Sequence, residues 1–156
     1  MTPHRFELVG TITIEDVADV RRFVEKLHRR FVRNGDDASR LAMATHELLE
    51  NAVKFSADGT ATLRIEIVDG AEFRVSTTNT ARAADRDALV TIAAELEAAQ
   101  DAMAFYIDLM ARAPRTRGGL GLGRIAAEGE MQIKLALREN IVEVSAKAKL
   151  AEPVVS

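Results

Sequence analysis

The chain contains no cysteine and no tryptophan, and it has only one tyrosine and three prolines in 156 residues. Without cysteine it can form no disulfide, offer no thiolate to a metal ion and provide no thiol nucleophile. No segment approaches the roughly 18 consecutive apolar residues that a membrane-spanning helix needs. The first residues, Met1–Arg5, are not followed by an uninterrupted apolar stretch, so no signal peptide is expected. These absences favour a cytoplasmic protein that does not enter a membrane.

An excess of charge of one sign is also lacking. Lysine and arginine number 21 against 24 aspartates and glutamates, so the formal net charge is −3 at pH 7. This balance gives no overall positive field that would attract nucleic acid or an anionic membrane. The hydrophobic fraction of 47% is that of an ordinary globular domain. We expect one domain over residues 1–150, followed by a flexible tail at 151–156.

Apolar residues alternate with polar ones in several segments, which is typical of strands that bury one face. Strands are expected near residues 6–12, 63–67 and 72–76. A hairpin is expected over residues 131–148, with its turn at Glu139-Asn140.

Other segments repeat apolar residues at helical spacing. The expected helices cover residues 15–31, 37–55 with Asp36 or Asp37 as N-cap, 86–112 as one long helix, and about 122–129. The full order is strand, helix, helix, two strands, helix, glycine segment with short helix, and two strands. A sheet covered on one face by helices buries these apolar stripes most simply, so the fold class is α+β.

Glu47 and Asn51 lie one turn apart on the expected second helix, and Glu50 and Lys54 share their face. A carboxylate and an amide in this arrangement can hold a hydrated cation. Asparagine is a poor residue for a helix interior because its side chain competes for nearby backbone groups, so its presence favours a specific role. The alternative, that these residues are only the solvated side of an amphipathic helix, stays open.

A glycine-rich segment, Gly118–Gly123, directly precedes the last expected helix. Glycines let backbone N–H groups approach an anion closely, and a helix N-terminus adds partial positive charge. The segment is not a P-loop, because no Gly-Lys-Ser/Thr ends it, and it lacks the preceding strand of a dinucleotide-binding fingerprint. Arg112, Arg115 and Arg117 lie nearby and can add charge. The segment therefore predicts a phosphate site, with a flexible connector as the alternative.

Together the two segments resemble the GHKL ATPase superfamily, in particular the small RsbW-like or SiaB-like serine kinases and anti-sigma factors of bacterial partner-switching pathways. Glu47–Ser56 is similar to the N box of that family, and Gly119–Leu122 is similar to its second glycine box. The resemblance covers nearly the whole chain. It implies a Bergerat-type two-layer sandwich, with a mixed and mostly antiparallel sheet and an ATP lid over Thr80–Arg117.

The resemblance also implies roles for individual residues. Glu47 would be the catalytic residue that activates a partner's hydroxyl group, and Asn51 would hold Mg²⁺. The residues implied for ATP binding are Asn51, Lys54, Asn79, Arg117, Gly119, Leu120, Gly121, Leu122 and Gly123.

One box of the family is degenerate in this chain. The family has an Asp-x-Gly-x-Gly segment after the strand expected at 72–76, and its aspartate receives the adenine amino group. Here the strand runs into Ser76–Thr80, which contains neither aspartate nor glycine. Thr77 or Asn79 can offer only a neutral acceptor. The ATP and Mg²⁺ that the other boxes imply are placed in doubt by this departure.

Two functions of different classes follow. The first is an ATP-binding serine/threonine protein kinase of a partner-switching pathway, which phosphorylates a small STAS-like or SiaC-like protein or acts on a sigma factor. The second is a catalytically inactive regulator with the same fold that acts by partner binding alone. Under the second function, the expected 86–112 helix can serve as a docking or homodimer element; the alternative is that it simply packs on the core. Neither nucleic acid nor a membrane is an expected partner.

Overall fold

The computed structural model describes residues 4–31, 34–112 and 119–150, and its elements follow the expected order with one additional helix. The strands are β1 (His4–Thr11), β2 (Thr60–Val68), β3 (Glu72–Thr80), β4 (Gln132–Arg138) and β5 (Ile141–Lys149). The helices are α1 (Ile14–Phe31), α2 (Gly35–Phe55), α3 (Ala83–Ala98), α4 (Ala102–Arg112) and α5 (Gly119–Ala127).

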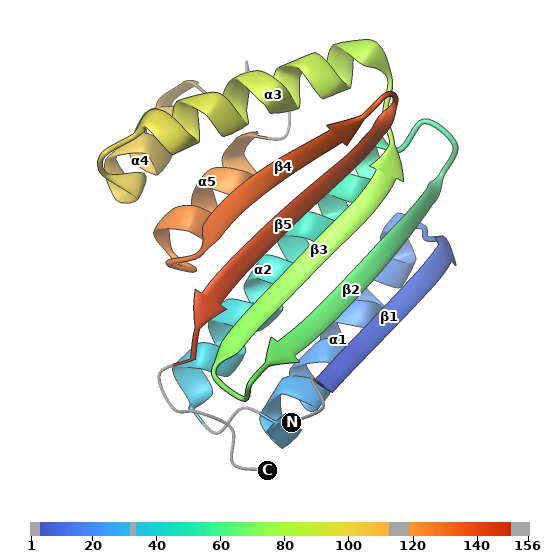
Figure 1. Cartoon of the computed structure of the whole chain (residues 1–156), viewed down its shortest axis with the longest axis vertical. Coiled ribbons are helices and arrows are strands. Elements are labelled where there is room, and N and C mark those ends of the chain that lie inside the picture. Colours follow the sequence, from blue (N-terminus) through green and yellow to red (C-terminus); the bar gives the residue numbers. More distant parts are fainter. Residues whose placement is uncertain (1–3, 32–33, 113–118, 151–156) are drawn as a thin grey trace.

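The strands form one sheet in the order β1-β2-β3-β5-β4. Figure 1 shows this sheet face-on, with α1 and α2 behind it. The α+β class and the helix-covered sheet are therefore confirmed. Each pairing between the described strands is antiparallel, so the parallel component of the expected mixed sheet is absent from this part of the chain.

The core lies between the sheet and α2. Alternate residues of β2 and β3 are buried, because successive side chains of a strand point to opposite faces. Leu63, Val75 and Phe73 meet Leu41 and Leu48 of α2, all of them at most 1% exposed. This stripe fixes the rotation of α2 about its axis, and it thereby decides which α2 residues face α5.

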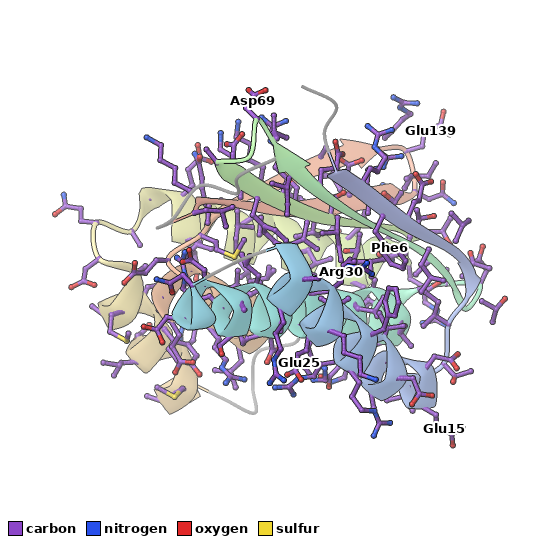
Figure 2. The ribbon with its side chains drawn as sticks, turned by 90° about the horizontal axis from the view of Figure 1, so that it is seen from below. Phe6, Glu15, Glu25, Arg30, Asp69 and Glu139 are labelled. Atoms are coloured by element: carbon purple, nitrogen blue, oxygen red, sulfur yellow. The ribbon has the colours of Figure 1, made fainter. Side chains whose placement is uncertain are left out.

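The first helix packs beside α2 at the β1 edge of the sheet. Seen from below in Figure 2, Phe6 points from β1 toward α1. There its ring contacts that of Phe23, with centroids 5.1 Å apart. Among the described residues, no helix has both the length and the apolar character to span a membrane.

The N-cap predicted for α2 is wrong. Asn34 holds that position in an extended conformation, and its side chain accepts hydrogen bonds from the backbone N–H groups of Asp36 at 3.0 Å and Asp37 at 3.1 Å. The helix therefore begins at Gly35 rather than at Asp37. Asparagine is as good an N-cap as aspartate, and the first suitable residue in the chain takes the position.

The single helix expected over residues 86–112 is also wrong, because the chain breaks at residues 99–101 into α3 and α4. The carboxylate of Asp101 accepts hydrogen bonds from the backbone N–H groups of Met103 at 2.9 Å and Ala104 at 3.2 Å. These bonds cap a new helix. The break lets α4 turn back against α5, which buries Leu109 to 1% exposure. Met103 and Met110 of α4 remain exposed.

Candidate functional site

The site predicted from the sequence centres on the middle of α2, where Glu47 and Asn51 lie. Because the buried stripe of α2 faces the sheet, these two side chains turn toward α5. The side chain of Glu47 is only 17% exposed, so it does not belong to a fully solvated helix face. The middle of α2 and the glycine-rich start of α5 are thus neighbours in the structure.

Glu47 is held by an ion pair. Its Oε1 atom accepts a hydrogen bond from Nη1 of Arg124 on α5 at 3.0 Å. Arg124 also donates from Nε to Glu128, one turn further along α5, at 2.8 Å. The hydrogen bond to Glu128 and then the one to Glu47 raise the pKa of Arg124 above its ordinary value, so the guanidinium stays charged. The carboxylate of Glu47 therefore already has a cationic partner.

From Gly119 onward, the glycine segment forms the first turns of α5 rather than a loop. The predicted start near Leu122 is wrong by three residues, since the helix begins at Gly119. Gly121 lies so close to α2 that an added Cβ atom would stand 2.8 Å from Oε2 of Glu47 and 3.3 Å from Nδ2 of Asn51. The absence of a side chain at this position lets the two helices touch. The first N–H groups of α5 have no acceptor within the helix, so its N-terminus still has donors for an anion.

Gly123 allows close packing on the other side of α5, against α4. An added Cβ atom would stand 2.8 Å from Cδ1 of Leu109 and 3.3 Å from Cδ1 of Tyr106, both on α4. Regularly spaced glycines thus fit α5 between α2 and α4. Close helix packing explains Gly121 and Gly123 without a bound phosphate.

A small cavity lies where a nucleotide base would be expected, between α2, β3, α3 and α5. Asn51 and Asn79 line it together, as do Leu48, Ala52, Phe55, Thr77, Leu89, Leu122 and Val144. Its volume is about 10 Å³. That is room for about one water molecule, whereas ligand pockets measure roughly 300–1,000 Å³. A nucleotide therefore does not fit between these residues as they stand, and ATP binding stays a prediction.

The remaining predicted residues lie around this cavity or away from it. Asn79 is 8% exposed, and its Nδ2 donates to the carbonyl oxygen of Thr80 at 2.9 Å. Leu122 is 1% exposed, Leu120 is 38% exposed on the first turn of α5, and Lys54 is exposed. Arg117 lies outside the described residues. The structure thus brings Asn51, Asn79 and Leu122 together around this cavity, whereas Lys54 does not line it.

Magnesium binding by Asn51 also stays a prediction. In the described part of the chain, no group of three or more histidine, aspartate or glutamate side chains is placed to hold a metal ion. A Mg²⁺ ion at Asn51 would need most of its ligands from water and phosphate, which is its usual coordination in phosphoryl-transfer sites.

Arg124 is the residue of this site that the sequence reasoning missed. It stands directly after Gly123, so its position in the sequence was a usable signal. An arginine that follows the glycine-rich start of one helix is a candidate ion-pair partner for a glutamate on the helix that packs against it. Which helix it faces, however, depends on how α5 packs.

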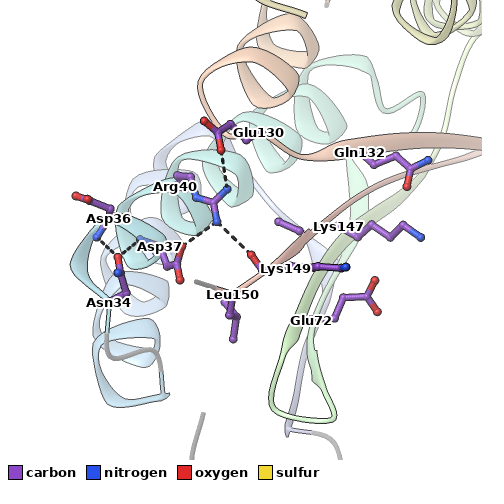
Figure 3. A pocket seen from close by; sticks show the side chains of 11 residues that line it. Asn34, Asp36, Asp37, Arg40, Glu72, Glu130, Gln132, Lys147, Lys149 and Leu150 are labelled. Carbon is purple, nitrogen blue, oxygen red and sulfur yellow. Dashed lines mark hydrogen bonds and ion pairs between the residues drawn. The ribbon is translucent and has the colours of Figure 1, made fainter. Parts of the chain in front are cut away.

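A larger cavity of about 810 Å³ lies near the start of α2 (Figure 3). Arg40 lies in its lining, and its guanidinium donates to Asp37 at 2.8 Å, to the carbonyl oxygen of Gly129 at 2.8 Å and to that of Lys149 at 3.4 Å. These bonds tie α2 to the α5–β4 turn and to the end of β5. The lining carries acids and bases together, including Glu72 and Glu130 beside the lysines. This mixture selects no ligand of one charge, so the contacts of Arg40 are interpreted as structural.

Comparison with known proteins shows that the fold of this chain is similar to that of a solved structure. No family model matches the chain, and no curated protein matches it in sequence. Among solved structures, it is similar to a chain of the crystal structure of the SiaB–SiaC complex from Pseudomonas aeruginosa. The TM-score is 0.67 at 17% sequence identity, over 92% of this chain and 89% of that chain. At this level of identity the comparison shows the fold alone.

Proposed function

We propose that this chain is a partner-switching regulator that acts by binding a small protein similar to SiaC. The observation that carries the proposal is the likeness to a chain of the SiaB–SiaC complex, which extends over 92% of this chain. Because the similarity of fold extends over almost the whole chain, we infer that this protein also uses its surface to bind a partner.

The geometry around α2 supports binding over catalysis. Glu47 is paired with Arg124 at 3.0 Å, so one of its two carboxylate oxygens already has a partner. The cavity beside Asn51 has a volume of about 10 Å³. The aspartate that receives adenine in the GHKL family has no counterpart in β3. Each of these features is compatible with a regulator that does not transfer phosphate.

Calorimetric titration of the purified chain with a SiaC-like protein from the same genome tests the proposal. We expect a complex of micromolar or tighter affinity that forms without nucleotide and that is unchanged by ATP·Mg²⁺. The Glu47→Gln variant should bind equally well, because binding needs no catalytic carboxylate. Failure to form a complex with any SiaC-like protein of that genome would overturn the proposal.

A second candidate function, an ATP-dependent serine/threonine protein kinase, is favoured by one observation. Glu47, Asn51 and the N-terminal turn of α5 adjoin one another, as the position of Gly121 requires. For nucleotide to enter, Leu89 of α3 and Leu122 of α5 would have to move apart, because both line the closed cavity.

A thermal melt with ATP·Mg²⁺ separates the two functions. Nucleotide that binds the folded chain should stabilise it by about 2.7 kcal/mol at a hundredfold excess over Kd. Transfer of labelled phosphate to the partner should then be abolished by Glu47→Gln and by Asn51→Ala. The matched control is Glu50→Gln, since Glu50 lies on the same helix but pairs with His46 at 3.2 Å. If ATP·Mg²⁺ neither raised the melting temperature nor supported phosphate transfer to the partner, only the regulator function would remain.

A further inference from the structure

The uncovered face of the sheet carries a cluster of cations on three neighbouring strands. Arg74 of β3, Lys147 of β5 and Gln132 of β4 stand directly opposite one another in register. In the next row, Lys134 of β4 stands opposite Ser145 of β5. We call these five residues the outer basic patch. They come from two sequence segments about 60 residues apart that only the sheet brings together.

The outer basic patch encloses a hollow of about 220 Å³ lined by its five residues and Ala146. This is smaller than the roughly 300 Å³ at which pockets for drug-sized ligands begin. Directly opposite residues on neighbouring strands have Cβ atoms about 5 Å apart, and diagonal ones about 7–8 Å. Lysine side chains from such positions can converge on one small group.

The charges in the outer basic patch are not balanced. Elsewhere on the same face, Arg5 pairs with Glu66 at 3.3 Å and Arg64 pairs with Glu7 at 3.4 Å. Within the patch, Arg74 pairs with Glu72 at 2.9 Å. Lys134 and Lys147 have no ion pair with any described residue.

Two further acids lie near the outer basic patch. Glu66 stands directly opposite Arg74 but pairs with Arg5. Glu143 stands opposite Ala136 and is diagonal to Lys134, but forms no ion pair with it within the described structure. Lys134 and Lys147 are therefore two positive charges of the patch that have no ion-pair partner within the described structure. Lys147 is half-buried among its neighbours, which makes its unpaired charge more costly than that of a fully solvated lysine.

Protection of a sheet edge explains only part of this arrangement. Lysines on edge strands discourage pairing with other chains, and Lys134 lies on the edge strand β4. Lys147 and Arg74, however, lie on the internal strands β5 and β3. Like charges directly opposite each other destabilise a sheet. An anion between the strands would remove this repulsion.

We propose that the outer basic patch binds a phosphate group or a similar doubly charged oxyanion. Lys134 and Lys147 supply the charge, while the Ser145 hydroxyl and the Gln132 amide donate hydrogen bonds. Arg74 borders the site and keeps its bond to Glu72. This site is distinct from the Asn51 cavity, which lies on the opposite face of the sheet, and it does not depend on the proposed function.

The test is a titration of the folded chain with inorganic phosphate, followed by two-dimensional amide NMR at constant ionic strength. We expect saturable shifts confined to β4, β5 and β3 around the outer basic patch. Lys147→Gln and Lys134→Gln should each weaken binding about tenfold, which corresponds to about 1.4 kcal/mol. The matched control Arg64→Gln, on the same face but outside the hollow, should leave the phosphate Kd unchanged.

A parallel titration with O-phosphoserine distinguishes free phosphate from a phosphorylated side chain as the source of the group. Binding of either ligand at the patch supports the site, and the tighter one names the source. Shifts centred on the N-terminus of α5, or a phosphate Kd equal in wild type and in both lysine variants, would overturn the proposal. A response that chloride reproduces at the same ionic strength would overturn it as well.

Discussion

Glu47 illustrates at the scale of single residues how a carboxylate with a predicted catalytic role acquires a structural partner. Its contact with Arg124 at 3.0 Å joins α2 to α5. Its second oxygen occupies the space beside Gly121. A carboxylate so placed serves the packing of two helices whether or not it also serves catalysis.

The Glu47–Arg124 pair should contribute modestly to stability. Because Arg124 is 43% exposed, water screens the pair, and we expect a coupling free energy of about 0.5–1 kcal/mol in a double-mutant cycle with Glu47→Gln and Arg124→Gln. The control pair, Asp19 and Arg22, is 74% and 71% exposed and should couple less. Urea unfolding of the variants measures both values. Equal coupling of the two pairs would contradict the interpretation.

Gly123 should not tolerate a methyl group. The added Cβ of Gly123→Ala would stand 2.8 Å from Cδ1 of Leu109, a side chain that is 1% exposed. Overpacking costs about 1–3 kcal/mol, and alanine returns up to about 1 kcal/mol in helix propensity. We therefore expect a net loss of up to roughly 2 kcal/mol in thermal or urea unfolding.

Gly35→Ala is the matched control for Gly123→Ala. Nothing lies within 4 Å of an added Cβ at Gly35. This variant should be neutral or more stable by up to about 1 kcal/mol. If both variants lost stability equally, the loss would reflect something other than crowding against α4.

At the scale of elements, the turn between α2 and β2 depends on one carboxylate. Asp58 accepts hydrogen bonds from the hydroxyl of Thr60 at 2.6 Å, from its backbone N–H at 2.9 Å and from the hydroxyl of Ser56 at 3.1 Å. The Thr60 hydroxyl, with the other donors, lowers the pKa of Asp58 from 3.8 to about 2. These bonds favour the ionised form, which alone accepts all of them.

The lowered pKa predicts how the turn responds to acid. Since the folded-state pKa is below the unfolded value, the contribution of Asp58 to stability is complete above pH 3.8 and is lost as the pH falls toward about 2. The carboxyl carbon shift of Asp58 in NMR should titrate with a midpoint near pH 2. The stability difference between wild type and Asp58→Asn should shrink over the same window. A midpoint at or above pH 3.8 would contradict the prediction.

The helices α3 and α4 show a feature that local sequence patterns did not predict, namely the break between them. Residues 86–112 contain no glycine or proline, so the sequence favoured one helix. Asp101 provides a cap in the middle, but a potential cap inside an alanine-rich segment is a weak signal by itself. The break is decided by packing, since only a bent chain places Leu109 against Gly123.

At the scale of the whole molecule, the segment from α3 to α4 belongs to the core. Leu89 and Ile92 are 5% and 4% exposed, and Leu89 also lines the cavity beside Asn51 and Asn79. If this segment were an ATP lid that opened freely, it would bury less apolar surface than it does here. The segment should therefore unfold together with the sheet.

Leu89→Ala tests this cooperativity. Removal of a buried leucine side chain costs about 2–5 kcal/mol, and we expect the global free energy of unfolding to fall by that amount with a single transition. The control is Val90→Ala on the same helix, where the side chain is 39% exposed and the loss should be smaller. A separate early transition in amide hydrogen exchange, confined to α3 and α4, would show instead that the segment opens on its own.

The sequence by itself determined the elements and the segments of interest. Alternation predicted the strands, because a strand with one buried face must place every second residue inward. Helical spacing predicted α1 and α2 for the equivalent reason. The sequence predicted that Glu47 and Asn51 lie near the Gly118–Gly123 segment. The structure does place α2 beside α5.

Tertiary structure alone decided how these parts meet. The order β1-β2-β3-β5-β4 inserts the last strand between β3 and β4, which brings Lys134 and Lys147 beside Arg74. The pairing of Glu47 with Arg124 and the closure of the cavity beside Asn51 depend in the same way on where α5 and α3 come to rest. Local patterns record which face of an element is apolar. They contain no information about which distant element covers it, because that choice depends on the combined packing of the whole core.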